Sequence, residues 1–394
     1  MKQQAVITGI GVVLPGVMSL EALWQTQLQA ATAIRPLSSR LHGSRIDEAD
    51  LGELLPSRLA KKLDAFTRYA LIASEFALND ARVELDTLDK TRSGVFVGNA
   101  FGGWRFTENE LRHLHNDGPR AVSPFQATSW FPAAPQGQIT IHYGFKGHSK
   151  TLMADRASGL HSVAAAAQQI EKGGLDLAIA GGCESTNTDF VRTALENFGS
   201  DDGDAALYAP LSTSASRFAV SEGAVFLVLE NATRAQQRGA YVYANVDGFA
   251  IATKPCAADR YQHDSATMMR AMSKALNGAY PDVVMPDACG VADADAVEAL
   301  AIAEIAGRAA IALPKVKFGH GYGMEGALDI AYACLMLQKQ QRLPTQIDTP
   351  LASLKTLRHS KTVNAAELDR ILINGCASGG SCSSLLLSKG KTKS

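Results

Sequence analysis

The chain alternates short apolar strands with amphipathic helices, and several of the strands run directly into glycine-rich turns. The stretches "SGVFVGNAFGG" and "GLDLAIAGGCES" each have the pattern of a buried strand followed by glycines. The stretches "TRYALIASEFALNDA" and "DADAVEALAIAEIAG" carry apolar residues at helical spacing. This alternation predicts an α/β fold in which parallel sheets are covered by helices on both faces.

Two further stretches predict how the strands are connected. "RFAVSEGAVFLVLENATRAQQRGA" is expected to form a β-hairpin followed by a helix, and "RILINGCASGGSCSSLLLSKG" a closing hairpin. We place a boundary near Gly239, which gives an N-terminal half over residues 1–239 and a C-terminal half over residues 240–394. No low-complexity linker separates the halves, so we expect them to pack as one body.

Composition excludes several classes of function. Lys and Arg total 38 against 39 Asp and Glu, which argues against a nucleic-acid partner or a membrane surface. The sequence has no run of about 18 apolar residues, so we expect no membrane-spanning helix. The six cysteines are scattered, as is typical of reduced thiols in a cytoplasmic protein. Without a CxxC, HExxH or correctly spaced GxGxxG motif, we expect neither a metal nor a cofactor.

The run "SKTLMADRASGLHSVAAAAQQI" resembles a turn that presents a nucleophile. An apolar strand leads into the small-residue turn 154–159, "ADRASG", and an alanine-rich helix follows. Such a turn normally places a Cys or Ser above the free N–H groups of a helix N-terminus. Here its apex carries Asp155 and Arg156, and arginine has no nucleophilic lone pair at neutral pH.

Together these stretches resemble the β-ketoacyl synthase family of thiolase-like condensing enzymes over nearly the whole chain. The resemblance rests on the order and spacing of "VITGIGVVLPG", "FVGNAFGG", "ASGLHSVAAAAQQI", "DLAIAGGCES", "RFAVSEGAVFLVLE", "AQQRGAYVYANVDG" and "KVKFGHGYGMEGA". The family implies two similar α/β halves stacked in five layers, α-β-α-β-α, and a dimer.

The resemblance also identifies the positions of the family's catalytic residues, and two of them are altered. The nucleophilic cysteine falls on Arg156, and the first of two histidines falls on Asp287. The catalytic lysine and the second histidine are kept as Lys315 and His320. The glycine-rich gate becomes "CASGGSC", with Cys376 and Ser378 at its phenylalanine positions. "CASG" there copies the nucleophile signature by coincidence, since no helix is expected behind it.

The two altered positions face each other across the site in the family fold, which suggests a pair. A buried Arg or a buried Asp alone would cost several kcal/mol. We therefore expect Arg156 and Asp287 to form an ion pair, with one or two hydrogen bonds, that fills the former active site. Asp155 is the competing partner of Arg156. For Lys315, His320 and Glu222 we favour a structural role.

The family implies a role for such a chain, the chain-length factor. This catalytically inactive subunit pairs with an active β-ketoacyl synthase and shapes the tunnel for an acyl or polyketide chain. Ser129, Trp130 and Phe131 are the candidate tunnel or interface residues. Acyl carrier protein would dock mainly on the partner. The short region 36–60 favours an aryl polyene product over an aromatic polyketide or a fatty acid.

Two other functions stay open at this point. One is an enzyme with a rebuilt site that acts on carrier-protein thioesters as a hydrolase, acyltransferase or decarboxylase. It would use Lys315, His320, Asp287 and Ser158. Asp287 argues against the decarboxylase, because its charge would face the enolate that forms. The other is a homodimeric scaffold that has no ketosynthase partner.

Overall fold

A ten-stranded mixed sheet runs through both halves of the molecule. The computed structural model describes residues 3–52, 54–196, 208–213, 218–257, 260–261, 264–345, 347, 349–354 and 360–390. In spatial order the strands of the sheet are β11 (Ala310–Ile311), β10 (Val283–Met285), β14 (Arg370–Ala377), β15 (Ser381–Lys389), β9 (Ala244–Thr253), β1 (Ala5–Val13), β8 (Gly223–Asn231), β6 (Leu177–Glu184), β4 (Ser93–Gly98) and β5 (Lys150–Leu152).

The two halves of this sheet have the same pairing pattern. From the centre outward, β1, β8 and β6 pair antiparallel, and β6, β4 and β5 pair parallel. In the same way β9, β15 and β14 pair antiparallel, and β14, β10 and β11 pair parallel. This repetition confirms two similar halves. The halves join where β1 pairs with β9, so the sheet runs across the predicted boundary near Gly239, which itself stays a prediction.

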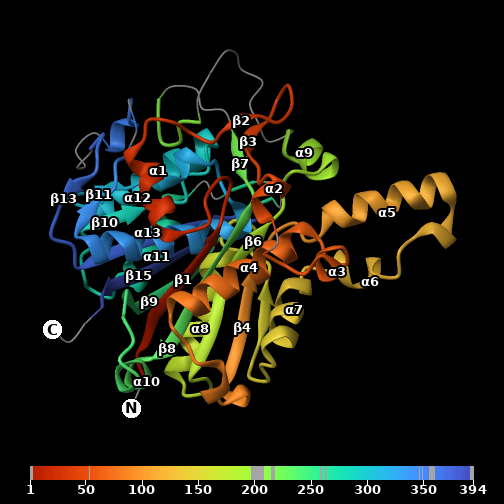
Figure 1. Ribbon diagram of the computed structural model, residues 1–394. Coiled ribbons are helices and arrows are strands. Elements are labelled where there is room, and N and C mark those ends of the chain that lie inside the picture. Colours follow the sequence, from red (N-terminus) through yellow and green to blue (C-terminus); the bar gives the residue numbers. More distant parts are fainter. Residues whose placement is uncertain are drawn as a thin grey trace.

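The helices complete the five predicted layers (Figure 1). The central layer consists of α8 (Ser158–Glu171) and α13 (Glu325–Lys339), which contact strands of both halves and share the largest apolar core. On the outer face of the first half lie α4 (Ala65–Asp80) and α7 (Ala134–Tyr143). On the outer face of the second half lie α11 (Ser265–Leu276) and α12 (Ala292–Ala306).

The remaining elements are short or peripheral. The other helices are α1 (Leu20–Leu28), α2 (Glu48–Leu51), α3 (Ser57–Ala60), α5 (Trp104–Asp117), α6 (Gln126–Ser129), α9 (Asp189–Glu196) and α10 (Ala232–Gln237). Small sheets join β2 (Arg35–Pro36), β3 (His42–Ser44) and β7 (Ala219–Ser221), and β12 (Gln341–Arg342) and β13 (Asn364–Ala365). The helix α5 extends away from the body of the molecule (Figure 1).

Two predictions about strand pairing were wrong. The sheets are not purely parallel, because antiparallel pairs join β1, β8 and β6 and their counterparts. The stretch from Phe218 to Glu230 is not a hairpin, although the helix after it is present as α10. Instead β7 pairs parallel with β3, and the chain then enters the main sheet as β8. The closing hairpin of β14 and β15 is confirmed.

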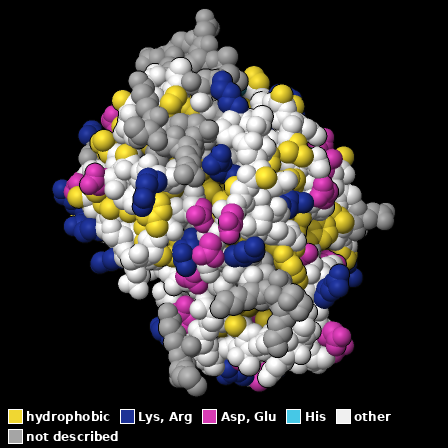
Figure 2. All heavy atoms as spheres, turned by 90° about the vertical axis from the view of Figure 1, so that its left-hand side faces the viewer, with side chains coloured by type: hydrophobic (Ala, Val, Ile, Leu, Met, Phe, Trp, Pro, Cys, Tyr) yellow, Lys and Arg dark blue, Asp and Glu magenta, His cyan; other side chains and the backbone are white. Residues whose placement is uncertain are grey.

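The described surface carries mixed charge on the side of the molecule that includes α12. Figure 2 shows this face, where acidic and basic side chains are interspersed with small apolar patches. Among the residues that the structure describes, no helix is long and apolar enough to cross a membrane.

The packing of α4 against β1 depends on a glycine and predicts a matched pair of stability changes. A Cβ atom added at Gly11 would lie 2.0 Å from the backbone oxygen of Ala73 in α4. We expect Gly11→Ala to lower the unfolding free energy by about 1–3 kcal/mol, since the helix must move. Gly137→Ala on α7 meets open space and should be neutral or stabilising by about 0.5–1 kcal/mol. Urea unfolding compares them, and equal effects would contradict this packing.

The contact between α8 and β9 predicts a pH dependence. The His161 ring packs against Phe249, and burial lowers the pKa of His161 to about 4. The unfolded chain, with a pKa near 6.5, therefore binds more protons between these values, so stability falls as the pH falls through this window. His161→Gln should reduce this loss by roughly 3 kcal/mol, measured by urea unfolding from about pH 7 to about pH 4. An unchanged slope in His161→Gln would contradict the account.

Candidate functional site

The predicted turn between β5 and α8 is present, and its backbone is held by a serine. Asp155 adopts a left-handed conformation with φ of 48°. The Ser158 hydroxyl donates to the Asp155 carbonyl at 2.6 Å and accepts from the Ala154 N–H at 2.8 Å. The hydrogen bonds of this hydroxyl thus join backbone groups of the turn. Ser158 is fully buried and holds the turn that presents Arg156.

Arg156 and Asp287 form the predicted ion pair. The Arg156 Nη2 atom lies 3.0 Å from Asp287 Oδ2, and the two side chains are 0% and 4% exposed. The expectation of a bidentate hydrogen-bonded pair was wrong, because no Arg156 nitrogen makes an aligned hydrogen bond to any described residue. The guanidinium instead stacks on the Tyr261 ring, with Cζ 3.6 Å from the ring centroid. Charge pairing and stacking together hold it.

The competing partner of Arg156 is directed elsewhere. Asp155 Oδ2 accepts a hydrogen bond of 2.9 Å from the Ser378 N–H, which belongs to the turn between β14 and β15. The carboxylate therefore links the turn before α8 to the turn between β14 and β15. Cys376 lies at the end of β14 and pairs with Cys382 of β15. A strand and not a helix follows it, which confirms that "CASG" is no nucleophile turn.

The loop that carries Asp287 is anchored by a buried glutamate. It follows β10, and both carboxylate oxygens of Glu298 on α12 accept from it. Glu298 Oε1 accepts from the Asp287 N–H and Oε2 from the Ala288 N–H, each at 2.9 Å. Burial, and next the charge of Asp287, raise the pKa of Glu298 to about 7. Glu298 thus fixes the backbone from which the Asp287 carboxylate reaches Arg156.

Lys315 uses all three of its donors. Its Nζ atom donates to the carbonyls of Pro286 and Asp287, each at 2.8 Å, and to Asp329 Oδ2 at 3.0 Å. Burial lowers the pKa of Lys315, but Asp329, Glu325 and Asp287 more than offset this, so the pKa lies above its ordinary value. Lys315 is therefore a fully paired cation that holds the Asp287 loop, consistent with the structural role expected for it.

His320 completes the group of four side chains. Its Nδ1 atom accepts from the Tyr322 N–H at 3.0 Å, so in the neutral ring the proton lies on Nε2. That Nε2 atom lies 3.5 Å from Asp287 Oδ1. Asp287 is thus flanked by Arg156 on one oxygen and His320 on the other. Burial raises the pKa of Asp287, but the charge of Arg156, the neighbouring His320 ring and the charge of Lys315 outweigh burial and hold it well below its ordinary value.

Among the described residues, the polar side chains of this group are engaged with one another or with the backbone. A guanidinium occupies the apex of the turn, and the nearby carboxylate is neutralised by it. The Lys315 donors and the Ser158 hydroxyl are engaged with their own chain. Each of Arg156, Asp287, Lys315 and His320 is at most 4% exposed at its side chain, which leaves no open face for a substrate in this group.

The three predicted tunnel or interface residues lie in two environments. The Ser129 side chain is buried, and its hydroxyl donates to the Lys62 carbonyl at 2.9 Å. Trp130 and Phe131 are 49% and 51% exposed, and their rings contact each other edge-on. Within this chain Ser129 positions the segment, while the two aromatics face outward. Their assignment to a tunnel wall or interface stays a proposal.

Two buried glutamates support the loops around the site. Glu184 accepts from the N–H groups of Ala100, Phe101 and Gly323. Glu222 accepts from the N–H groups of Ile46 and Asn187, as expected for a structural residue. Burial raises the pKa of Glu184 to about 8 and that of Glu222 to about 7.

Sequence reasoning missed several residues that contact the group. Glu298 lies on the helix that follows the Asp287 loop, and Tyr261 lies far from Arg156 in the sequence; neither belongs to a recognisable motif. The carboxylates Glu325 and Asp329 beside Lys315 could have been predicted from the sequence. Their spacing of four residues at the start of an apolar helix places both on one helix face, close to the "KVKFGH" segment.

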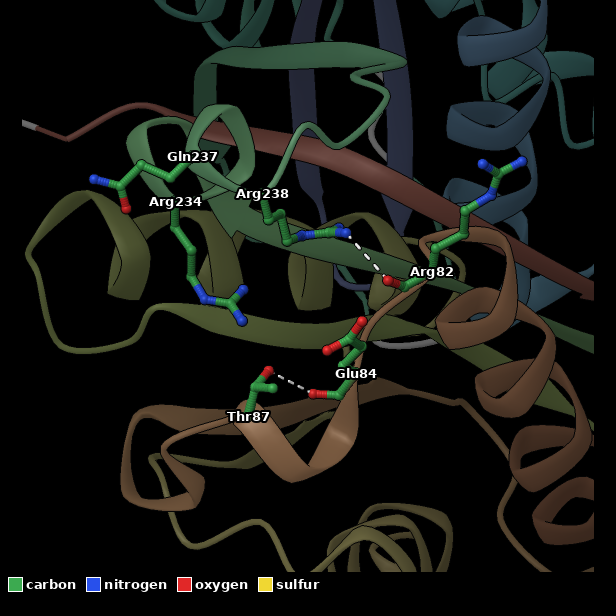
Figure 3. Close-up of a pocket in the computed structure, with 6 residues that line it drawn as sticks. All are labelled: Arg82, Glu84, Thr87, Arg234, Gln237 and Arg238. Atoms are coloured by element: carbon green, nitrogen blue, oxygen red, sulfur yellow. Dashed lines mark hydrogen bonds between the residues drawn. The ribbon is translucent and has the colours of Figure 1, made fainter.

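A surface pocket of about 360 Å³ lies elsewhere, between α10 and the segment after α4 (Figure 3). It is lined by Arg82, Glu84, Thr87, Arg234, Gln237 and Arg238. Two of these arginines, Arg234 and Arg238, are paired with the buried carboxylate of Glu230. Arg238 also donates to the backbone carbonyls of Ala81 and Arg82. These arginines thus connect α10 to its surroundings, and we assign the pocket no ligand.

Two family models match the chain. The β-ketoacyl synthase N-terminal domain matches residues 2–235, and the β-ketoacyl synthase C-terminal domain matches residues 243–348. Among curated relatives, the tetracenomycin polyketide synthase ketoacyl synthase beta subunit of Streptomyces glaucescens is 32% identical over 351 residues. The match covers 84% of this chain and 85% of that protein.

Solved structures share the fold. One is a type II polyketide synthase acyl-carrier protein in complex with its ketosynthase bound to the hexaketide. It matches with a TM-score of 0.77 and 26% identity over 99% of this chain and 100% of that one. The ishigamide ketosynthase/chain length factor matches with a TM-score of 0.88 over 99% of this chain and 100% of that one. Its 20% identity shows the fold alone. The thiolase-like fold expected from the sequence is confirmed.

The ion pair predicts an unequal response to loss of a carboxylate. Asp287→Asn leaves the buried Arg156 charge without a counterion and should lower the unfolding free energy by about 3–5 kcal/mol. Glu48→Gln removes the partner of Arg68 at a site where Glu48 is 44% exposed and should cost less than about 1 kcal/mol. Urea unfolding at neutral pH compares the two variants.

A double variant separates the missing charge from the altered packing. Arg156→Met with Asp287→Leu removes both buried charges at similar volume, so it should recover most of the stability lost in Asp287→Asn. If Asp287→Asn lowers the unfolding free energy no more than Glu48→Gln does, the Arg156–Asp287 pair is not held in a dry interior.

Proposed function

We propose that this chain, which belongs to the β-ketoacyl synthase family, is the chain-length-factor subunit of a ketosynthase heterodimer. The observation that carries the proposal is the Arg156–Asp287 ion pair, which occupies the positions where the family's nucleophile and first histidine are expected. A subunit whose former site is filled by its own side chains does no condensation by itself. It can still shape the tunnel of an active partner.

The names of the relatives support a paired role. The Streptomyces glaucescens relative is named a ketoacyl synthase beta subunit, and one structural neighbour is a ketosynthase/chain length factor. Another holds an acyl-carrier protein together with its ketosynthase. We therefore propose an active β-ketoacyl synthase as the direct partner, with acyl carrier protein docking mainly on that partner. The proposed product class is a polyketide, and an aryl polyene or fatty-acid product stays a prediction, as does a cytoplasmic location.

One side of the molecule has the character of a subunit interface. Strand β5 is the outermost strand of the main sheet, so one row of its backbone groups has no neighbouring strand among the described residues. Exposed apolar side chains flank it: Ile141 on α7 is 75% exposed and Met153 after β5 is 55% exposed. Trp130 and Phe131, also exposed, lie in the segment that leads into α7. An open strand edge with exposed apolar neighbours favours association with another chain.

The rebuilt-enzyme hypothesis has less support. A hydrolase needs a nucleophile next to a base, whereas the Ser158 hydroxyl bonds backbone groups. A decarboxylase needs donors aimed at an enolate, whereas the Asp287 carboxylate lies between Arg156 and His320. Neither arrangement presents a free catalytic group.

Native mass spectrometry tests the pairing. The chain is measured alone and after co-expression with the ketosynthase encoded beside it, and we expect a one-to-one heterodimer that forms in preference to the homodimer. A stable homodimer that ignores the ketosynthase would instead support the scaffold function.

A surface variant locates the interface. Ile141→Asp should weaken the heterodimer at least about tenfold, because it places a carboxylate in the apolar contact. Leu300→Asp is the control, since Leu300 is also an exposed helical residue, at 55%, but lies on α12 of the other half. Dissociation constants come from titrations of the two purified subunits. Equal loss in both variants, or none in Ile141→Asp, would contradict the proposed interface.

A further inference from the structure

Two cysteines face each other across the β14–β15 hairpin. Cys376 and Cys382 are direct partners in the antiparallel register. Opposite residues of an antiparallel pair have Cα atoms about 4.5–5.5 Å apart. A disulfide requires a Cα separation of about 4.4–6.8 Å. The register therefore brings the two thiols to bridging distance without any rearrangement of the strands, and both cysteines are free in this structure.

The three-residue turn between the strands suits such a closure. Gly379 and Gly380 have φ values of 78° and 95°, so the tight reversal sits on the residues best able to adopt it. Cys376 is partly exposed, whereas Cys382 is 1% exposed. A small oxidant in solution therefore reaches Cys376 first, and Cys382 is positioned as the second thiol.

We propose that Cys376 and Cys382 are a redox-active dithiol that closes reversibly to a disulfide at the base of the hairpin turn. The proposed subunit role uses neither thiol, so this modification site goes beyond it and does not depend on it. The turn carries Ser378, whose N–H binds the Asp155 carboxylate next to Arg156. Closure would thus cross-link the hairpin that holds the nucleophile-type turn.

The closure is a thiol–disulfide exchange with a small-molecule disulfide as oxidant. The Cys376 thiolate attacks one sulfur of glutathione disulfide, which forms a mixed disulfide and releases one glutathione thiolate. The Cys382 thiolate then attacks the Cys376 sulfur and releases the second glutathione. The protein loses two thiol protons and two electrons, and the oxidant is reduced to two thiols that take up the protons. A dithiol such as dithiothreitol reverses the sequence.

The environment of the pair sets how the rate depends on pH. The hydrogen bond between the two thiols, and then burial, raise the pKa of Cys376 above its ordinary value. Because the thiolate is the attacking species, closure should be slow at neutral pH. It should accelerate about tenfold per pH unit while the thiol remains protonated.

Peptide mapping of the native full-length chain tests the proposal. The folded protein is incubated with glutathione disulfide, quenched with acid, alkylated without reduction and digested with trypsin. Both cysteines fall in one expected peptide, residues 371–389, so the internal disulfide appears as a loss of two hydrogens with no alkylation. Dithiothreitol before quenching should restore two alkylated thiols.

Variants distinguish this pairing from its alternatives. Cys256 also lies at the hairpin, since its N–H donates to the Gly379 carbonyl at 3.2 Å. Cys256→Ser should leave the closure unchanged, whereas Cys376→Ser and Cys382→Ser should each abolish it. A cross-link from peptide 371–389 to the peptide that carries Cys256 would overturn the proposal. A stable glutathione adduct without closure, or no reaction up to about pH 9, would also overturn it.

Discussion

The structure of the former site depends on one requirement, that a buried guanidinium have a nearby carboxylate. Arg156 is enclosed on all sides, and its charge could not remain in this interior without Asp287 at 3.0 Å. The Tyr261 ring covers one face of the guanidinium, and His320 lies against the far oxygen of Asp287. Each of the two buried charges would be costly without the other.

The fold delivers the two charges from its two halves, each from a loop that follows a parallel strand. Arg156 follows β5, the outer parallel strand of the first half, and Asp287 follows β10, a parallel strand of the second half. Residues of neighbouring elements support the Asp287 loop. Glu298 on α12 accepts from the Asp287 N–H, and Lys315 donates to the Asp287 carbonyl. The loops that carry Arg156 and Asp287 thus present their side chains to each other.

Much of this was predictable from the sequence, and the failures have physical causes. The strand and helix alternation identified the core, because burial leaves a local pattern of apolar residues. The pairing of Arg156 with Asp287 followed from opposite charges at two positions that the family places together. The hairpin assigned to the stretch around Glu222 was wrong, because local sequence does not say which strand a segment pairs with. The stacking of Tyr261 on Arg156 joins residues far apart in the chain, and the anchoring of the Asp287 loop by Glu298 belongs to no recognisable motif.

The central claim is that the Arg156–Asp287 pair is a structural filling and that condensation occurs in the partner subunit. The most direct measurement is the condensation rate and product length of the purified heterodimer with this chain carrying Arg156→Met and Asp287→Leu together. The account predicts an intact heterodimer whose turnover stays within about twofold of wild type, a change of less than about 0.5 kcal/mol in the barrier. A loss of tenfold or more in a heterodimer that still forms would show that the pair takes part in the chemistry.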